Sequence, residues 1–129
     1  MIEMPDLDRA REELRRLFGF ADFRGRQADV IARVLAGQST LAVMPTGAGK
    51  SLTYQLPATM LEGTCVVISP LIALMHDQVQ ALEERGIPAT YLAGTLTSDE
   101  MRRRMAEASR GIYKLIYVAP ERLTFDGFR

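Results

Sequence analysis

The chain has 129 residues, of which 47% are hydrophobic and 25% are charged, a composition typical of a globular domain with a buried core. Its 16 basic and 16 acidic residues cancel, which excludes an overall electrostatic attraction to nucleic acid, so any such binding must be local. One cysteine excludes an internal disulfide, one histidine argues against a histidine-based metal site, and no apolar run approaches the ~18 residues of a membrane span.

Two helices are predicted before any strand. Apolar residues at helical spacing line one face near residues 7–18 and another near 25–36, where Gly37 ends the helix. Further along, short apolar runs alternate with helical segments. The runs are nearly continuous in apolar residues, as strands covered on both faces are, and they occupy residues 40–44, 64–69, 89–92 and 114–118. The predicted fold class is α/β, a parallel sheet with flanking helices.

Two more helices are predicted between the later strands. The first ends at Gly86, and its apolar face is made of Leu71, Leu74, Met75, Val79 and Leu82. We expect most of the first three of these side chains to lie in the core. The second helix begins with the capping pattern Thr97-Ser98-Asp99-Glu100 and ends at Gly111.

A glycine-rich loop follows the first predicted strand, in the segment Met44-Pro45-Thr46-Gly47-Ala48-Gly49-Lys50-Ser51. Strand, glycine loop, Gly-Lys-Ser and helix is the arrangement of a P-loop. The glycines let backbone N–H groups approach a phosphate, and the following helix N-terminus adds a partial positive charge. Lys50 would reach the outer phosphates as the catalytic residue, and Ser51 would place its hydroxyl on Mg²⁺. We therefore predict a nucleoside triphosphate site formed by Thr46, Gly47, Ala48, Gly49, Lys50 and Ser51.

A short aromatic turn precedes this loop, in the segment Phe18-Gly19-Phe20-Ala21-Asp22-Phe23-Arg24-Gly25-Arg26-Gln27. A glutamine amide matches the donor and acceptor edge of adenine, and an aromatic ring and a guanidinium group can enclose a base. The alternative is that Phe18 and Phe23 belong to the core, and that Gln27 is only a polar residue at the start of a helix.

Four motifs, taken in order, resemble the RecQ family of DNA helicases. They are Phe-Gly-x-x-x-Phe-Arg-x-x-Gln, Met-Pro-Thr-Gly-x-Gly-Lys-Ser, the run from Ser69 to Gln78, and Ala-Pro-Glu-Arg-Leu at 119–123, and they cover most of residues 17–125. The resemblance implies a RecA-like P-loop NTPase fold. It also implies two divisions, helices with an adenine-recognition motif over 1–37 and an incomplete first motor domain over 38–129.

The resemblance also implies roles for single residues. Phe20 would stack on adenine, Arg24 would cover the ring and Gln27 would read its edge, with ATP and Mg²⁺ as cofactors. Single-stranded or duplex DNA would be the partner. The contacts would lie at Ser69, Pro70, Leu71 and Gln78, where backbone N–H groups of this segment and the N-terminus of the following helix would face the phosphates. Pro120, Glu121 and Arg122 would help to guide the DNA. The alternatives are that Gln78 belongs to a solvated helix face and that Glu121 caps the next turn.

Catalytic turnover in such a helicase needs an Asp-Glu pair after an apolar strand. Asp99-Glu100 follows no such strand, and in RecQ helicases the Asp-Glu-Ala-His segment lies beyond the point where this chain stops. We therefore expect an N-terminal fragment of an ATP-dependent 3′→5′ DNA helicase of repair or recombination, bacterial, cytoplasmic and nucleoid-associated, that has no turnover alone. Two alternatives stay open, a module that only binds nucleotide and another superfamily 2 motor, such as an RNA helicase or translocase.

Overall fold

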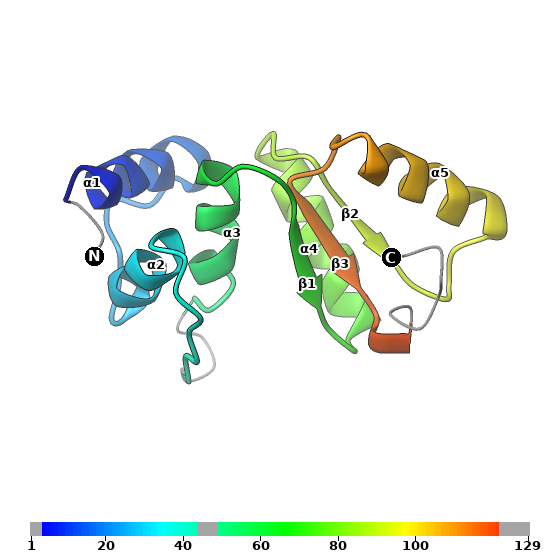
Figure 1. Ribbon diagram of the computed structural model, residues 1–129, viewed down its shortest axis with the longest axis horizontal. Helices are drawn as coiled ribbons and strands as arrows, with labels where there is room; N and C mark the ends of the chain where they lie inside the picture. Colours follow the sequence, from blue (N-terminus) through cyan, green and yellow to red (C-terminus); the bar gives the residue numbers. More distant parts are fainter. Residues whose placement is uncertain (1–3, 44–48, 122–129) are drawn as a thin grey trace. The chain divides into compact units, whose positions relative to one another are not determined.

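A computed structural model describes residues 4–43 and 49–121, with side chains from residue 7 onwards in the first range. The chain forms two compact units, Met1–Glu62 and Gly63–Arg129. This division falls after the third helix (Figure 1), whereas the boundary inferred from the motifs follows Gly37 and stays a prediction. None of the helices in the described ranges is long and apolar enough to span a membrane.

The described part of the first unit is helical. Its elements are α1 (Met4–Glu13), the π-helix η1 (Leu14–Phe18), α2 (Gln27–Leu35) and α3 (Leu52–Met60). Both α1 and α2 contact α3. The core contains Ala10, Leu14 and Phe18 from the first helical stretch, together with Ile31 and Leu56. Leu14 and Phe18 are four residues apart, about one helical turn, and therefore lie on the same buried side of the π-helix.

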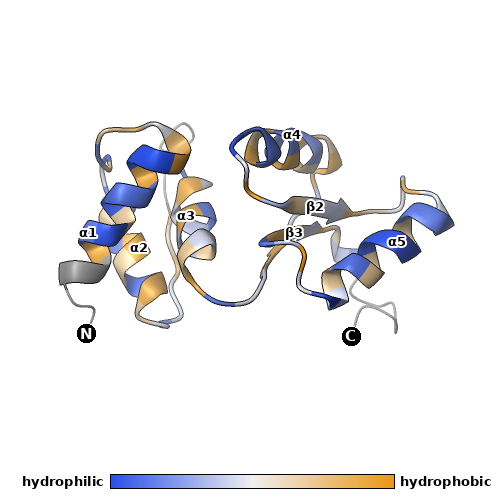
Figure 2. Cartoon of the chain, turned by 90° about the horizontal axis from the view of Figure 1, so that it is seen from above, coloured by the Kyte–Doolittle hydropathy of each residue, from blue (hydrophilic) through white to orange (hydrophobic). Residues whose placement is uncertain are grey.

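The second unit is a three-stranded parallel sheet in the order β1-β3-β2. Its elements are β1 (Cys65–Ile68), α4 (Ile72–Glu84), β2 (Ala89–Leu92), α5 (Ser98–Ser109) and β3 (Leu115–Val118). All four residues of the central strand β3 are buried. The two helices lie on opposite sides of the sheet (Figure 2), and Met101 and Met105 of α5 pack against Leu92, Ile116 and Val118. The α/β class, the parallel sheet and three of the four predicted strands are thus confirmed.

The outer border of β2 is covered by side chains from both helices. The carbonyl oxygen of Tyr91 accepts a hydrogen bond from Arg104 Nη1 at 2.9 Å, and the guanidinium group lies 4.7 Å from the centre of the Tyr91 ring. The imidazole of His76 on α4 meets the same ring edge-on, with the ring centres 6.0 Å apart. Arg104 Nε in turn donates a hydrogen bond to Glu100 Oε2 at 3.3 Å. These contacts leave a hollow of about 610 Å³ between α4 and β2.

The predicted strand over 40–44 is wrong across its described part. Residues 40–43 form no strand, Leu41 is 91% exposed and Val43 is 88% exposed, while Met44 lies outside the described residues. A strand is stable only where a neighbouring strand takes up its backbone hydrogen-bonding groups. None of the strands in the described ranges pairs with this segment.

The expectation that most of Leu71, Leu74 and Met75 lie in the core is also wrong. Met75 is 1% exposed, but Leu71 is 59% and Leu74 is 45% exposed. The buried face of α4 consists of Met75, Val79 and Leu82, at positions i, i+4 and i+7, whereas Leu71 precedes the first turn and Leu74 is rotated away from this face.

Replacing Leu115 by alanine should lower the free energy of unfolding by about 2–5 kcal/mol, because it leaves a cavity in the central strand. Leu41→Ala removes the same atoms from an exposed side chain and should change the free energy of unfolding by less than about 0.5 kcal/mol. Denaturant titration followed by circular dichroism measures both. If Leu41→Ala also lowered the free energy of unfolding by about 2–5 kcal/mol, residues 40–43 would have to be packed as a strand.

Candidate functional site

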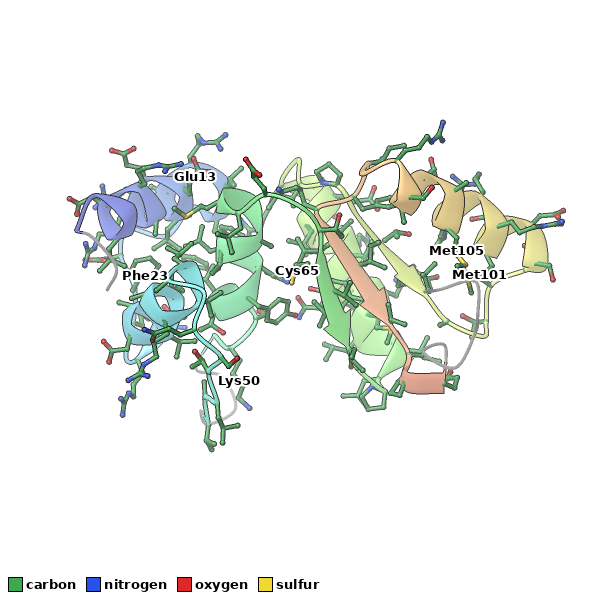
Figure 3. The ribbon with its side chains drawn as sticks, in the orientation of Figure 1. Glu13, Phe23, Lys50, Cys65, Met101 and Met105 are labelled. Atoms are coloured by element: carbon green, nitrogen blue, oxygen red, sulfur yellow. The ribbon has the colours of Figure 1, made fainter. Side chains whose placement is uncertain are left out.

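The end of the predicted P-loop coincides with the start of α3. The carbonyl oxygen of Lys50 accepts hydrogen bonds from the N–H of Thr53 at 3.0 Å and from its hydroxyl at 2.6 Å. Ser51 has helical dihedral angles, and its side chain makes no capping hydrogen bond. Lys50 is exposed at the N-terminal end of α3 (Figure 3). The other loop residues of the prediction, Thr46, Gly47 and Ala48, lie outside the described residues.

Gln27, at the start of α2, connects the aromatic turn to this loop. Its side chain is only 3% exposed. Its Oε1 accepts a hydrogen bond from the N–H of Arg24 at 2.8 Å, and its Nε2 donates to the carbonyl oxygen of Gly49 at 3.3 Å. Gly49 has a φ of +72°, and a Cβ placed on it would lie 2.3 Å from Gln27 Nε2. Both observations favour glycine at this position.

The aromatic residues of the turn differ in burial. Phe18 is 6% exposed and belongs to the core, as the alternative interpretation of the sequence has it. Phe23 is half-buried, while Phe20 is 51% exposed and Arg24 is exposed. The structure therefore leaves at the surface the ring and the guanidinium group that the family resemblance assigns to adenine.

Three residues that the sequence analysis did not single out hold this turn. Asp22 Oδ1 accepts hydrogen bonds from the N–H of Phe23 at 2.8 Å and from Arg11 Nε at 3.2 Å, and Arg15 Nε donates to the carbonyl oxygen of Ala21 at 3.0 Å. The Phe23 N–H and then the Arg11 guanidinium lower the pKa of Asp22 below its ordinary value. The only sequence signal for these contacts was an aspartate in a turn, a residue that readily accepts a hydrogen bond from a nearby backbone N–H.

The segments predicted to contact DNA follow β1 and β3. Because these strands are neighbours and parallel, their carboxyl ends meet at one edge of the sheet, where the N–H of Ser69 donates to the carbonyl oxygen of Val118 at 3.1 Å. Pro70 and Leu71 are exposed beside the first turn of α4, and Pro120 and Glu121 are exposed after β3.

Two of the predicted DNA-binding residues stand apart from that edge. Gln78 is half-buried within α4 and engaged with other groups of the protein. Arg122 lies outside the described residues. The structure thus brings together the two loop segments and leaves Gln78 on the helix that follows one of them.

Asp99 and Glu100 belong to the surface of α5, as the capping pattern predicts. The N–H of Glu100 donates to Thr97 Oγ1 at 3.2 Å. Asp99 pairs with Arg102, while Glu100 pairs with Arg103 at 2.7 Å and with Arg104. Arg103 is the main cause of a pKa for Glu100 below its ordinary value. Carboxylates held in this way start and stabilise a helix, and their interpretation as a helix start is confirmed.

Comparison with known proteins supplies the family. The model of the DEAD/DEAH box helicases matches residues 24–126. An ATP-dependent DNA helicase RecQ of Bacillus subtilis (strain 168) is 51% identical over 119 residues, which are 92% of this chain and 20% of the relative. One of Synechocystis sp. is 42% identical over 120 residues, covering 93% of this chain and 25% of the relative. A RecQ-like DNA helicase, blm-1 of Caenorhabditis elegans, is 43% identical over 118 residues, with coverages of 90% and 12%.

The chain spans a quarter or less of the length of these relatives. Within that span the family model covers the aromatic turn from Arg24 onwards, the P-loop and both segments predicted to contact DNA. The matches confirm the resemblance to RecQ helicases, and the chain belongs to the DEAD/DEAH box helicase family.

Proposed function

We propose that this chain binds ATP with Mg²⁺ at the turn before α3 and contacts single-stranded DNA at the carboxyl ends of β1 and β3. In a longer protein it would be part of a 3′→5′ DNA helicase of RecQ type, which acts on DNA in the bacterial cytoplasm, at the nucleoid. The relatives' names, ATP-dependent DNA helicase, support this proposal over an RNA helicase or translocase.

The observation that carries the nucleotide proposal is the hydrogen bond between Gln27 Nε2 and the Gly49 carbonyl oxygen. It links the turn that contains Phe20 and Arg24 to Gly49, the residue before Lys50. The segment that would bind the base and the segment that would bind the phosphates are therefore joined by a hydrogen bond. Reading adenine would require the Gln27 amide to face the N6 and N7 groups of the base. The 3.3 Å bond to Gly49 is longer than the 2.8 Å bond from the Arg24 N–H, and we expect the Gly49 bond to be the one that exchanges for adenine.

Ser51 suits a magnesium ion held mainly by the nucleotide. Mg²⁺ prefers oxygen ligands and usually keeps several waters together with the phosphates of a substrate. The Ser51 hydroxyl is such an oxygen, and it is not used to cap α3. In the described ranges no cluster of three or more His, Cys, Asp and Glu residues could hold a metal alone. We therefore expect Mg²⁺ to bind together with ATP, whose phosphate charge it would neutralise.

The DNA proposal rests on backbone groups, in agreement with the zero net charge of the chain. The first turn of α4 presents N–H groups without intrahelical partners, next to exposed Pro70 and Leu71. Phosphates of a single strand would accept from these N–H groups, and the helix N-terminus would add its partial positive charge.

Lys50→Ala should weaken the binding of ATP or ADP by about 1.5–3 kcal/mol, the value of a hydrogen bond to a charged group. The matched control is Lys114→Ala, which removes the other lysine of the chain from the end of the loop before β3. Titration calorimetry on both variants gives the comparison. The same affinity for Lys50→Ala as for the unchanged chain would contradict the proposed phosphate contact.

The unchanged chain should prefer ATP to GTP by ~1–3 kcal/mol, because the wrong base would leave polar atoms of the site unpaired. Gln27→Ala should remove most of this preference. Since the variant also loses the bond to Gly49, the ratio of the two affinities isolates base recognition from any general loss. Equal affinities for ATP and GTP in the unchanged chain would rule out the adenine clamp.

The 129 residues alone should not hydrolyse ATP at the rate of a helicase, with or without single-stranded DNA. An arginine finger by itself contributes ~10³–10⁵ in rate in related systems, and we expect these residues to supply neither that finger nor an Asp-Glu pair after an apolar strand. Steady-state phosphate release measures the rate, with Lys50→Ala as background. DNA-stimulated turnover that disappears in Lys50→Ala would show that a carboxylate of this chain positions the attacking water.

A further inference from the structure

Residues 19–26 join η1 to α2, and two arginines of the preceding helical stretch hold this loop in its middle. Arg11 Nε contacts Asp22 Oδ1 at 3.2 Å, and Arg15 Nε donates to the Ala21 carbonyl oxygen at 3.0 Å. The Arg11 guanidinium also lies 5.8 Å from the centre of the Phe23 ring. Because Arg11 and Arg15 are one helical turn apart, they face the loop from the same side.

These contacts fix the position of the loop more than they stabilise the fold. The Asp22 side chain is 62% exposed and that of Arg11 is 30% exposed, and ion pairs at such sites contribute little to folding. Other pairs of this stretch, such as Arg16 with Glu13, join residues three apart within the helical stretch. The pair of Arg11 with Asp22 instead joins residues 11 apart and fixes a loop against a helix.

The loop is also held from its other side. The amide of Gln27 accepts from the N–H of Arg24 and donates to the Gly49 carbonyl oxygen. Phe20 and Arg24, the two exposed groups assigned to adenine, therefore flank residues 21–23, which the two arginines contact. A loop that is ordered before its ligand arrives avoids the entropy loss of being ordered by the ligand.

We propose that Asp22 and Arg11 are positioning residues for the nucleobase, which keep the loop in the shape that presents Phe20 and Arg24 to an adenine ring. The inference rests on the proposed function and goes beyond it. Asp22 stands at an unspecified position of the motif, and Arg11 precedes the motif. Neither residue contacts the nucleotide, and both act through the backbone of residues 21–23.

The test compares ATP with inorganic triphosphate, each with Mg²⁺, by titration calorimetry on the 129-residue chain. Asp22→Ala should weaken ATP binding roughly twofold to tenfold, the value of ordering one or two groups, and leave the affinity for triphosphate unchanged. Asp22→Asn keeps an oxygen acceptor without the charge and should recover part of the loss.

The matched control is Asp8→Ala, which removes the same charge and another partner of Arg11, 3.3 Å away, without touching the loop. It should leave the ratio of ATP to triphosphate affinity unchanged. A second readout is hydrogen exchange of the Phe23 amide, which should become faster in Asp22→Ala because its acceptor is gone.

The possible outcomes separate this inference from the proposed function. Equal losses of ATP and triphosphate affinity in Asp22→Ala would show that the residue only supports the fold. Unchanged ATP affinity in both Asp22→Ala and Arg11→Gln, or unchanged exchange of the Phe23 amide, would overturn the positioning role as well. If the unchanged chain binds neither ATP nor triphosphate, the proposed function fails, and the inference fails with it.

Discussion

The side chain of Gln27 has to satisfy two backbone segments at once, and the candidate nucleotide site depends on this constraint. It bonds the Arg24 N–H and the Gly49 carbonyl oxygen from a position that is 3% exposed. A buried amide that loses a partner costs about 1–3 kcal/mol, so neither segment moves freely without the other. Gly49 follows from the same constraint, because a Cβ would occupy the place of Gln27 Nε2. The aromatic turn and Gly49 are therefore coupled through this one side chain.

The local pattern of apolar residues predicted most of the secondary structure. It failed where a strand forms only if a segment distant in sequence pairs with it. The strands near 64–69, 89–92 and 114–118 were predictable because burial on both faces makes a strand apolar throughout, as in the fully buried β3. The run over 40–43 has the same composition, but none of the described strands pairs with it, and its side chains are exposed. An apolar composition shows that a segment could form a buried strand, but it does not show whether a neighbouring strand is there to pair with it.

The candidate site shows the same limit. Lys50 and Ser51 were predictable at a helix start because loop, lysine and helix are adjacent in sequence. The bond from Gln27 to Gly49 crosses 22 residues, and that from Arg11 to Asp22 crosses 11. With 16 basic and 16 acidic residues available, sequence alone offers many pairings of this kind. Which of them forms is decided by packing.

The two borders of the sheet are unequal. At β2 the Tyr91 carbonyl oxygen is already occupied by Arg104, and the aromatic ring is covered by the same guanidinium group. At β1 the side chains of Val66 and Ile68 are 48% and 56% exposed. An incoming strand would first have to displace Arg104 from the Tyr91 carbonyl oxygen, so this side chain protects the β2 border of the sheet against pairing with another strand.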